Sequence, residues 1–228
     1  ISISSDETRH YLNGIYFHKT KIQNQSFLTG VATDSHRLSS SSIEIDENIN
    51  FDPIILPKKT VYQLISLLEQ TTDNIKISNN KSKVKFEMNN GVLISKVIDG
   101  RFPDYTKVVP RDNNKILQIK LNDFKKSVER VTTVSADRKE GLKMFISKDS
   151  LKLSVNNPNS GEGIENINVK FNSEDMEISF NSRYLIDIAS QIESESIIIN
   201  LKDGNSPVLI NDPSDQNSFH VVMPMKIW

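Results

Sequence analysis

The sequence predicts an α+β fold built from a repeated unit, in which a few helices lie on one side of antiparallel sheets. Most of the 228 residues alternate between polar and apolar types with a period of two, which is typical of strands. Three stretches instead have the helical period of 3.6 residues. Similar segments also recur in the same order in the two halves of the chain, which indicates a duplicated supersecondary unit.

The repeat consists of two pairs of segments. SSDETRHYLNGIYF, from Ser4, aligns loosely with SADRKEGLKMFIS, from Ser135, and the segment from Ile55 aligns with the segment from Ile178. Before Ser135 the second half also has a strand-like stretch, Ile116 to Leu121, and a helix-like stretch, Asn122 to Val134. The first half has no room for these two stretches. We therefore expect the first domain to lack its opening strand and helix.

Short strands separated by Asn, Gly and Asp turns are predicted along most of the chain. In addition to Ile116–Leu121, they are predicted over Asn13–Lys19, Phe27–Ala32, Ser41–Ile45, Asn74–Ser78, Lys83–Met88, Val92–Val97, Leu142–Ser147, Leu151–Val155, Ile164–Phe171, Met176–Phe180, Ser196–Leu201, Val208–Asn211 and Phe219–Met223.

Three amphipathic helices are predicted between these strands. They cover Lys58–Gln70, Asn122–Val134 and Arg183–Ile192. The residues expected to be buried are Val61, Leu64, Ile65 and Leu68 in the first helix, Leu121, Phe124, Val128 and Val131 in the second, and Leu185, Ile188, Ala189 and Ile192 in the third. Asn122 is expected to cap the second helix, because an Asn side chain accepts from the free amides of a first turn.

The segment Arg101 to Lys115 separates the two halves. It contains two prolines and several polar residues with little periodicity, as an interdomain linker does. We therefore predict two domains, one over residues 1–113 and one over residues 114–228. The linker also carries Phe102 and Tyr105, so we expect it to pack against the folded protein.

The composition excludes several classes of site. There is no cysteine, which removes disulfides, thiolate catalysis and cysteine-ligated zinc. The net charge is −1, so any nucleic-acid contact needs lysines and arginines gathered on one face. The sequence has no glycine-rich phosphate loop and no metal-ligand spacing among its histidines, which are His10, His18, His36 and His220. We expect no metal, no cofactor and no catalytic residues.

Two segments leave functional alternatives open. Asp34, Ser35 and His36 suggest a hydrolytic triad, but adjacent residues of an extended segment point to alternate sides, so a structural turn is favoured. In the segment HVVMPM, Val221 and Val222 suit a last core strand, whereas methionines beside a proline suit an apolar groove for peptides. One candidate function is that of a β-rich module that binds peptide or carbohydrate.

Six motifs, taken in order, resemble the bacterial DNA polymerase sliding clamp family, the beta subunit of the replicative polymerase. They are TRHYLNGI (from Thr8), VATDSHRL (from Val31), DGRFPDY (from Asp99), NNP (from Asn156), MEISFNSRYL (from Met176) and VVMPMK (from Val221). The resemblance implies repeated clamp-type domains with sheets outside and helices on the inner face. It also implies a non-catalytic homodimeric ring around duplex DNA in the bacterial cytoplasm, which holds the replicative polymerase, the clamp loader and repair proteins through their short linear motifs.

The resemblance also implies roles for individual residues. The partner-peptide pocket would comprise Arg9, Leu12, Thr33, His36, Arg37, Leu38, Pro103, Lys107, Val108, Asn181, Tyr184, Val221, Val222, Met223, Pro224 and Met225. Lys59, Lys126 and Arg183 would face DNA, and Thr133 and Val134 would lie at the subunit contact.

Some positions differ from the pattern that is commoner in this family. Ser35 stands where glycine is frequent, Lys107 stands where arginine is frequent, and the chain ends in Ile227 and Trp228. We expect these differences to alter details of the pocket. We also expect this chain alone to be monomeric, or at least not to close a ring.

Overall fold

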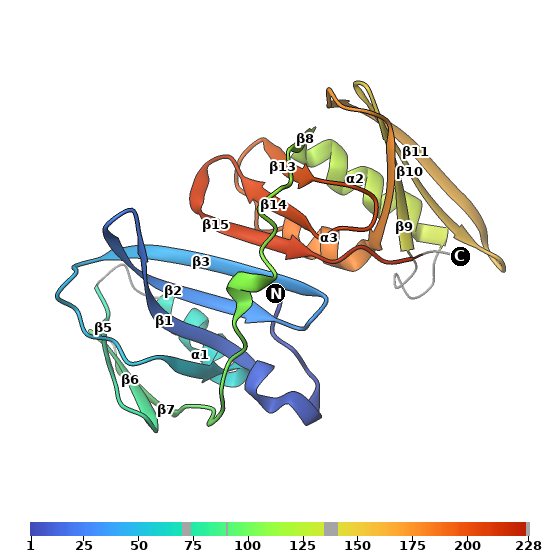
Figure 1. Ribbon diagram of the computed structural model, residues 1–228. Coiled ribbons are helices and arrows are strands. Elements are labelled where there is room, and N and C mark those ends of the chain that lie inside the picture. The colour runs from blue at the N-terminus through green and yellow to red at the C-terminus, as the bar shows by residue number, and fades with distance from the viewer. Residues whose placement is uncertain (70–73, 90, 135–140, 227–228) are drawn as a thin grey trace. The chain divides into compact units, whose positions relative to one another are not determined.

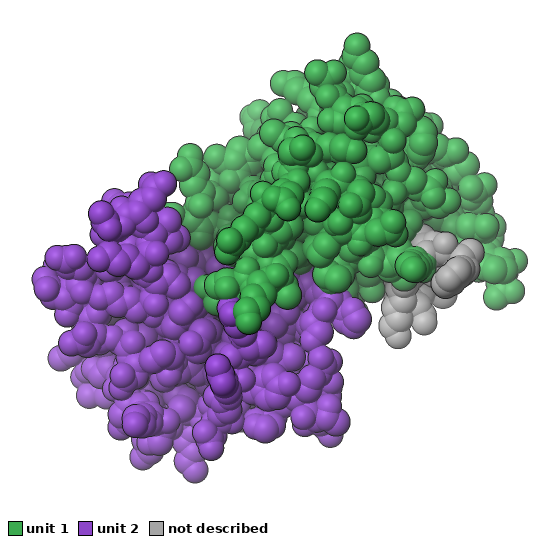
Figure 2. All heavy atoms as spheres, in the orientation of Figure 1, with its two compact units in different colours: residues 1, 105–228 green, residues 2–104 purple. Residues whose placement is uncertain are grey.

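The computed structural model describes residues 1–69, 74–89, 91–134 and 141–226. These residues form two compact units, one of residues 2–104 and one of residue 1 with residues 105–228 (purple and green in Figure 2). We call them the N-terminal and the C-terminal unit. Gln70 of the first predicted helix, residues 135–140 of the repeat segment from Ser135, and Ile227 and Trp228 lie outside the described residues.

The N-terminal unit consists of two antiparallel sheets and one α-helix (Figure 1). Its elements are η1 (Glu7–Leu12, a 3-10 helix), β1 (Gly14–Ile22), β2 (Gln25–Thr33), β3 (Arg37–Ile45), β4 (Ile54–Pro57), α1 (Lys58–Leu68), β5 (Lys76–Asn79), β6 (Lys83–Met88) and β7 (Gly91–Lys96). The strand order is β4-β1-β2-β3 in one sheet and β5-β6-β7 in the other.

The C-terminal unit has one continuous run of eight paired strands and two α-helices (Figure 1). Its elements are η2 (Tyr105–Lys107), β8 (Lys115–Lys120), α2 (Leu121–Val131), η3 (Thr132–Val134), β9 (Gly141–Ser147), β10 (Ser150–Asn157), β11 (Gly161–Lys170), β12 (Met176–Asn181), α3 (Ser182–Ala189), β13 (Ser196–Leu201), β14 (Val208–Asp212) and β15 (Asp215–Val222). The strand order is β12-β9-β10-β11-β8-β13-β14-β15.

The two units share one connectivity. The order β4-β1-β2-β3 corresponds to β12-β9-β10-β11, and β5-β6-β7 corresponds to β13-β14-β15. In the C-terminal unit β8 pairs with both β11 and β13 and so joins the two halves of the sheet. Within the described part of the N-terminal unit, no strand or helix corresponds to β8 and α2.

Each α-helix begins on the residue after a strand, without an intervening loop. The first amide of α1, on Lys58, donates to the carbonyl of Asn13 (3.1 Å), and the first amide of α2, on Leu121, donates to the carbonyl of Glu195 (2.9 Å). Backbone carbonyls of other segments therefore satisfy amides that a side-chain cap would otherwise serve. The prediction that Asn122 caps the second helix was wrong, because the helix begins one residue earlier and its N-cap is Lys120.

Burial of the helices follows what covers them. In the C-terminal unit α2 packs against α3, and Leu185, Ile188 and Ala189 are buried. The equivalent face of α1 is open. Ile65 and Ala189 each lie eight residues after the N-cap of their helix, but Ile65 is 47% exposed whereas Ala189 is 0% exposed. The prediction that Ile65 is buried was therefore wrong, because the described N-terminal unit has no second helix to cover it.

The core of the C-terminal unit depends on a close approach between β11 and the end of α2. A Cβ atom built on Gly163 would lie 2.6 Å from the carbonyl oxygen of Val131, a distance that real Cβ atoms do not reach. Beside this contact Arg130 forms an ion pair with Glu165 of β11 (2.7 Å). Glycine is therefore required at position 163 for the helix to lie this close to the strand.

We predict that Gly163→Ala destabilises the protein by about 1–3 kcal/mol, because the added methyl group forces the strand and helix apart. Urea denaturation followed by far-UV circular dichroism measures the change. Gly91→Ala in β7 is the control, since a Cβ there meets no atom within 4 Å. Equal urea midpoints for Gly163→Ala and Gly91→Ala would contradict the proposed requirement for glycine at position 163.

Candidate functional site

A tight turn between β2 and β3 forms the centre of the predicted site in the N-terminal unit. The Asp34 carboxylate accepts the amides of His36 (3.0 Å) and Arg37 (2.9 Å). The Thr33 hydroxyl accepts the amide of Ser35 (3.1 Å) and donates to the carbonyl of Arg37 (2.8 Å). Asp and Thr side chains thus replace backbone partners, as in Asx and Ser/Thr turns.

Two arginines are attached to this turn, Arg37 by an ion pair and Arg9 by a hydrogen bond. Arg37 Nε lies 3.0 Å from Asp34 Oδ2, and these two side chains are only 10% and 17% exposed. Arg9 Nε donates to Asp6 (2.8 Å) and its Nη1 donates to the Ser35 hydroxyl (2.6 Å). Arg9 therefore links η1 to the turn, and the position of its guanidinium is determined on both sides.

Asp6 organises the start of η1. Its carboxylate accepts the hydroxyl and the amide of Thr8 at 2.6 and 2.8 Å. Bonds from the Thr8 hydroxyl, Arg9 and the Thr8 amide lower the pKa of Asp6 to about 2. Neither η1 nor this link was predicted from the sequence. The available signal was an aspartate directly before a short segment, ETRHYL, because Asp is a favoured N-cap.

The Ser35 and His36 side chains do not form a nucleophile–base pair in this arrangement. The Ser35 hydroxyl is engaged by Arg9, and the His36 side chain is exposed. Ser35 also has a φ of +77°, in the left-handed region. This backbone conformation explains why glycine is suited to the position. The turn is a structural one.

Apolar residues of the predicted pocket in this unit have unequal exposure. Leu12 and Leu38 are buried, at 3% and 2% exposure, so they support the surface from beneath. Pro103 is exposed. Thr33 is half-buried within its turn.

The rest of the predicted pocket lies in the C-terminal unit. Lys107 ends η2 and is exposed, as is Val108. Asn181 caps α3 by accepting the amide of Arg183 (3.0 Å), and Tyr184 in the first turn is half-buried against the core. In β15 Val221 and Val222 are buried, and Val222 belongs to the hydrophobic core. The valines thus have the surroundings of a core strand.

The residues after β15 turn back along β12. The amide of Met225 donates to the carbonyl of Ser179 (2.8 Å), which places this tail beside the strand that leads into Asn181 and α3. Met223 and Met225 are 43% and 37% exposed, and Pro224 is half-buried. A backbone bond therefore holds this tail, with its two exposed methionines, beside β12.

Asp212 fixes the hairpin from which β15 and the tail extend. Its carboxylate accepts the amide of Glu193 (2.7 Å) and the amide and hydroxyl of Ser214 (2.8 and 2.6 Å). Burial alone would raise the pKa of Asp212, but the bonds from the Ser214 hydroxyl and from the two amides outweigh it and hold the pKa well below its usual range. No role for Asp212 was predicted from the sequence.

The predicted DNA-facing residues all lie on helices and are exposed. Lys59 and Arg183 are the second residues of α1 and α3, and so occupy the same position of the repeat, while Lys126 lies in the middle of α2. Of the predicted subunit-contact residues, Thr133 is exposed and Val134 is half-buried against the core.

Among the described residues, no group of three or more His, Asp or Glu side chains is arranged to hold a metal ion. None of the helices within that part of the chain is long and apolar enough to cross a membrane.

Family models identify the chain. The model of the central domain of the DNA polymerase III beta subunit matches residues 1–104, and the model of its C-terminal domain matches residues 106–226. The chain therefore belongs to the DNA polymerase III beta subunit family, whose curated members are beta sliding clamps. The family resemblance seen in the sequence motifs is confirmed.

Known relatives agree with this assignment. The beta sliding clamp of Caulobacter vibrioides is 37% identical over 227 residues, and that of Escherichia coli K12 is 30% identical over 226 residues. The alignments cover 99% of this chain and 61% of each relative. The chain thus spans about three fifths of the length of these relatives.

Solved structures confirm the predicted α+β clamp fold. A sliding clamp of Bartonella birtlesii bound to griselimycin has a TM-score of 0.95 at 39% identity, and it is matched over 99% of this chain and 61% of its own. A beta sliding clamp of Caulobacter crescentus has a TM-score of 0.96 at 37% identity, with 99% and 60% coverage.

We predict that Ser35→Gly is more stable than Ser35→Ala by about 1 kcal/mol, because both lose the bond from Arg9 but only glycine removes the cost of the left-handed backbone. Thermal denaturation of the two variants measures this difference. If alanine proves as stable as glycine, the strain argument fails.

A second prediction concerns pH. Because the native pKa of Asp212 is depressed, its contribution to stability is present above the unfolded pKa of about 4 and is lost as the pH falls below that value. We expect Asp212→Asn to lower the free energy of unfolding at pH 7 and to flatten its decline between pH 5 and pH 2. Denaturant titrations at several pH values test this. Asp112→Asn is the control, because this linker aspartate is exposed and lies 3.9 Å from Lys202, and it should lower the free energy of unfolding at pH 7 much less than Asp212→Asn does.

Proposed function

We propose that this chain serves as part of a DNA sliding clamp, a processivity factor that encircles duplex DNA and catalyses nothing. Membership of the beta subunit family supports the proposal, as does the clamp fold. The full-length protein would act as a homodimeric ring in the bacterial cytoplasm, with Thr133 and Val134 at the subunit contact. We also predict that the boundary between the two domains lies near residue 113.

The charges on the helices support a DNA-facing role. Lys59 and Arg183 stand in the first turns of α1 and α3, and neither first turn contains an acidic residue. A cation at a helix N-terminus opposes the helix dipole and so costs stability. A contact with a DNA phosphate would explain why both copies of the repeat have a cation at this position. Such contacts read no base sequence, which suits a ring that moves along DNA.

The tail and the turn support a role in binding partner peptides. The observation that carries this proposal is the pair of exposed methionines, Met223 and Met225, held beside β12 by one backbone bond. Methionine side chains adapt to differently shaped apolar anchors. Arg9 and Arg37, whose positions are determined by Asp6 and Asp34, would offer donors to polar groups of a peptide. The replicative polymerase, the clamp loader and repair proteins would bind here through short linear motifs.

We predict saturable micromolar binding of a fluorescent peptide that carries the clamp-binding linear motif, measured by fluorescence anisotropy on the 228-residue chain. Met223→Ala should weaken the affinity about tenfold, because anchor residues dominate such interfaces. Ile22→Ala, at an exposed isoleucine that ends β1, is the matched control and should change nothing.

Griselimycin offers a second probe, because the Bartonella birtlesii relative was solved bound to it. If griselimycin binds this chain at the proposed peptide site, it should compete with the fluorescent peptide. A folded sample that binds no peptide at millimolar concentration would refute the proposed peptide site. Hydrolysis of an ester substrate that is lost in Ser35→Ala would refute the non-catalytic assignment.

A further inference from the structure

The outer face of the sheet β5-β6-β7 carries an unusual combination of side chains. The strand register places Lys76, Glu87 and Val92 in one row across the sheet, and Ser78, Lys85 and Ile94 in the next. Lys83 and Lys96 face each other in a third row. Residues directly opposite each other in antiparallel strands share a face, so these side chains form one surface. We call it the lysine–aliphatic face.

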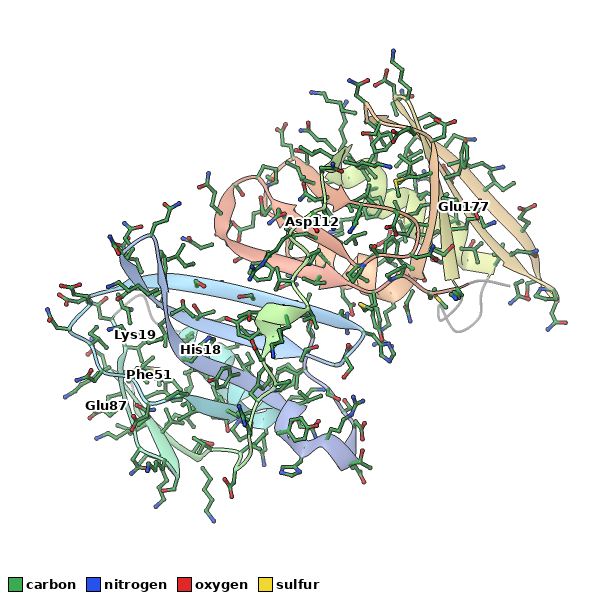
Figure 3. The ribbon with its side chains drawn as sticks, in the orientation of Figure 1. His18, Lys19, Phe51, Glu87, Asp112 and Glu177 are labelled. Carbon is green, nitrogen blue, oxygen red and sulfur yellow. The ribbon has the colours of Figure 1, made fainter. Side chains whose placement is uncertain are left out.

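The other side of the sheet belongs to the core of the N-terminal unit. Val84, Phe86 and Met88 of β6 are buried there against Ile54 and Leu56. Because side chains alternate along a strand, the lysine–aliphatic face points away from this core. Figure 1 shows the sheet, and Figure 3 marks Glu87 on its middle strand. The core packing of Val84, Phe86 and Met88 thus holds β6 in place behind the lysine–aliphatic face.

The charge on this face is strongly one-sided. It carries four lysines, Lys76, Lys83, Lys85 and Lys96, against a single acid, Glu87. Lys85 forms an ion pair with Glu87 (2.9 Å), and this bond, with the nearby charge of Lys76, lowers the pKa of Glu87. In a chain whose net charge is −1, this is a local positive surface.

Two large aliphatic side chains lie among the lysines. Val92 is 57% exposed and Ile94 is 60% exposed, and both stand on the same face of β7, two residues apart. Solvent-exposed strand positions are usually polar, and lysines alone would protect a sheet from aggregation. The adjacent Val92 and Ile94 instead give the face an apolar stripe that a partner can cover.

The chemistry of the face favours one class of partner. Binding of single-stranded nucleic acid uses aromatic stacking and arginine, and the face offers neither. Membrane surfaces are bound by amphipathic helices that insert Trp, Phe and Leu side chains, whereas the apolar stripe of this face is Val92 and Ile94 on a strand. An acidic peptide with aliphatic residues matches both the lysines and the apolar stripe.

We propose that the lysine–aliphatic face binds an acidic protein segment that carries aliphatic side chains. The carboxylates of this segment pair with Lys83, Lys85 and Lys96, and its aliphatic residues cover Val92 and Ile94. This surface lies outside the peptide site proposed above, shares no residue with it and does not depend on it.

The probe is a fluorescent twelve-residue peptide that alternates glutamate with leucine, titrated against the 228-residue chain at low and at physiological salt. We expect saturable binding that weakens with salt, as screening of charge pairs requires. Lys83→Glu with Lys85→Glu should weaken the affinity about tenfold, and Ile94→Ser about threefold, because charge reversal and loss of apolar cover act separately.

Matched controls separate this site from general charge effects. Lys143→Glu with Lys152→Glu reverses two lysines on β9 and β10, and Ile164→Ser changes an exposed isoleucine of β11; both should leave the affinity unchanged. Met223→Ala should also have no effect on this peptide. Thermal denaturation checks that each variant is folded. If Lys83→Glu with Lys85→Glu does not fold, Lys96→Gln replaces it and should weaken the affinity about twofold.

Several outcomes would overturn the proposal. They are equal binding of a lysine–leucine peptide, equal loss of affinity in the control variants, and absence of binding at low salt by a folded sample. Tighter binding of single-stranded DNA or of anionic phosphatidylserine vesicles that is lost in Lys83→Glu with Lys85→Glu would assign the face to a different class of partner.

Discussion

The direct passage from a strand into a helix is the constraint on which the rest of this structure depends. It occurs three times, at Pro57, Lys120 and Asn181, each time without a loop. A helix that begins where a strand ends must turn back over the same sheet, so its apolar stripe is pressed against one face only. In β10, for example, Leu151 and Leu153 are buried, whereas Lys152 on the other face is exposed.

In the two units, the burial of equivalent strands depends on whether a second helix is present. Ile197 and Ile199 of β13 are fully buried where β8 pairs beside them and α2 packs on α3, whereas Ile77, on the equivalent strand β5, is 37% exposed. The sequences of β5 and β13 are similar, so the difference comes from the neighbouring elements. Burial in a repeat protein is thus a property of the completed unit, as it is for stacked repeats in general.

Much of the fold could be predicted from the sequence because its signals are local. Strand alternation and helical period located most elements, and the repeat gave their order. The misses have physical causes. β4 was overlooked because Ile54, Ile55 and Leu56 are all buried, so the strand has no alternation to detect. The cap of α2 comes from the carbonyl of Glu195, which lies 74 positions away in the sequence and which no local pattern indicates.

The candidate site was harder to predict than the fold, and the reason is its construction. Motif resemblance supplied the names of the residues, but the links that position them, from Asp6 through Arg9 to Ser35 and from Asp212 to Ser214, join charged and hydroxyl groups within irregular segments. These bonds hold the Arg9 guanidinium and the β14–β15 hairpin in place, and they produce no hydrophobic periodicity that could be detected in the sequence. In the proposed peptide site Met223 and Met225 can remain exposed, because the bond from the Met225 amide to the Ser179 carbonyl holds the backbone of the tail in place.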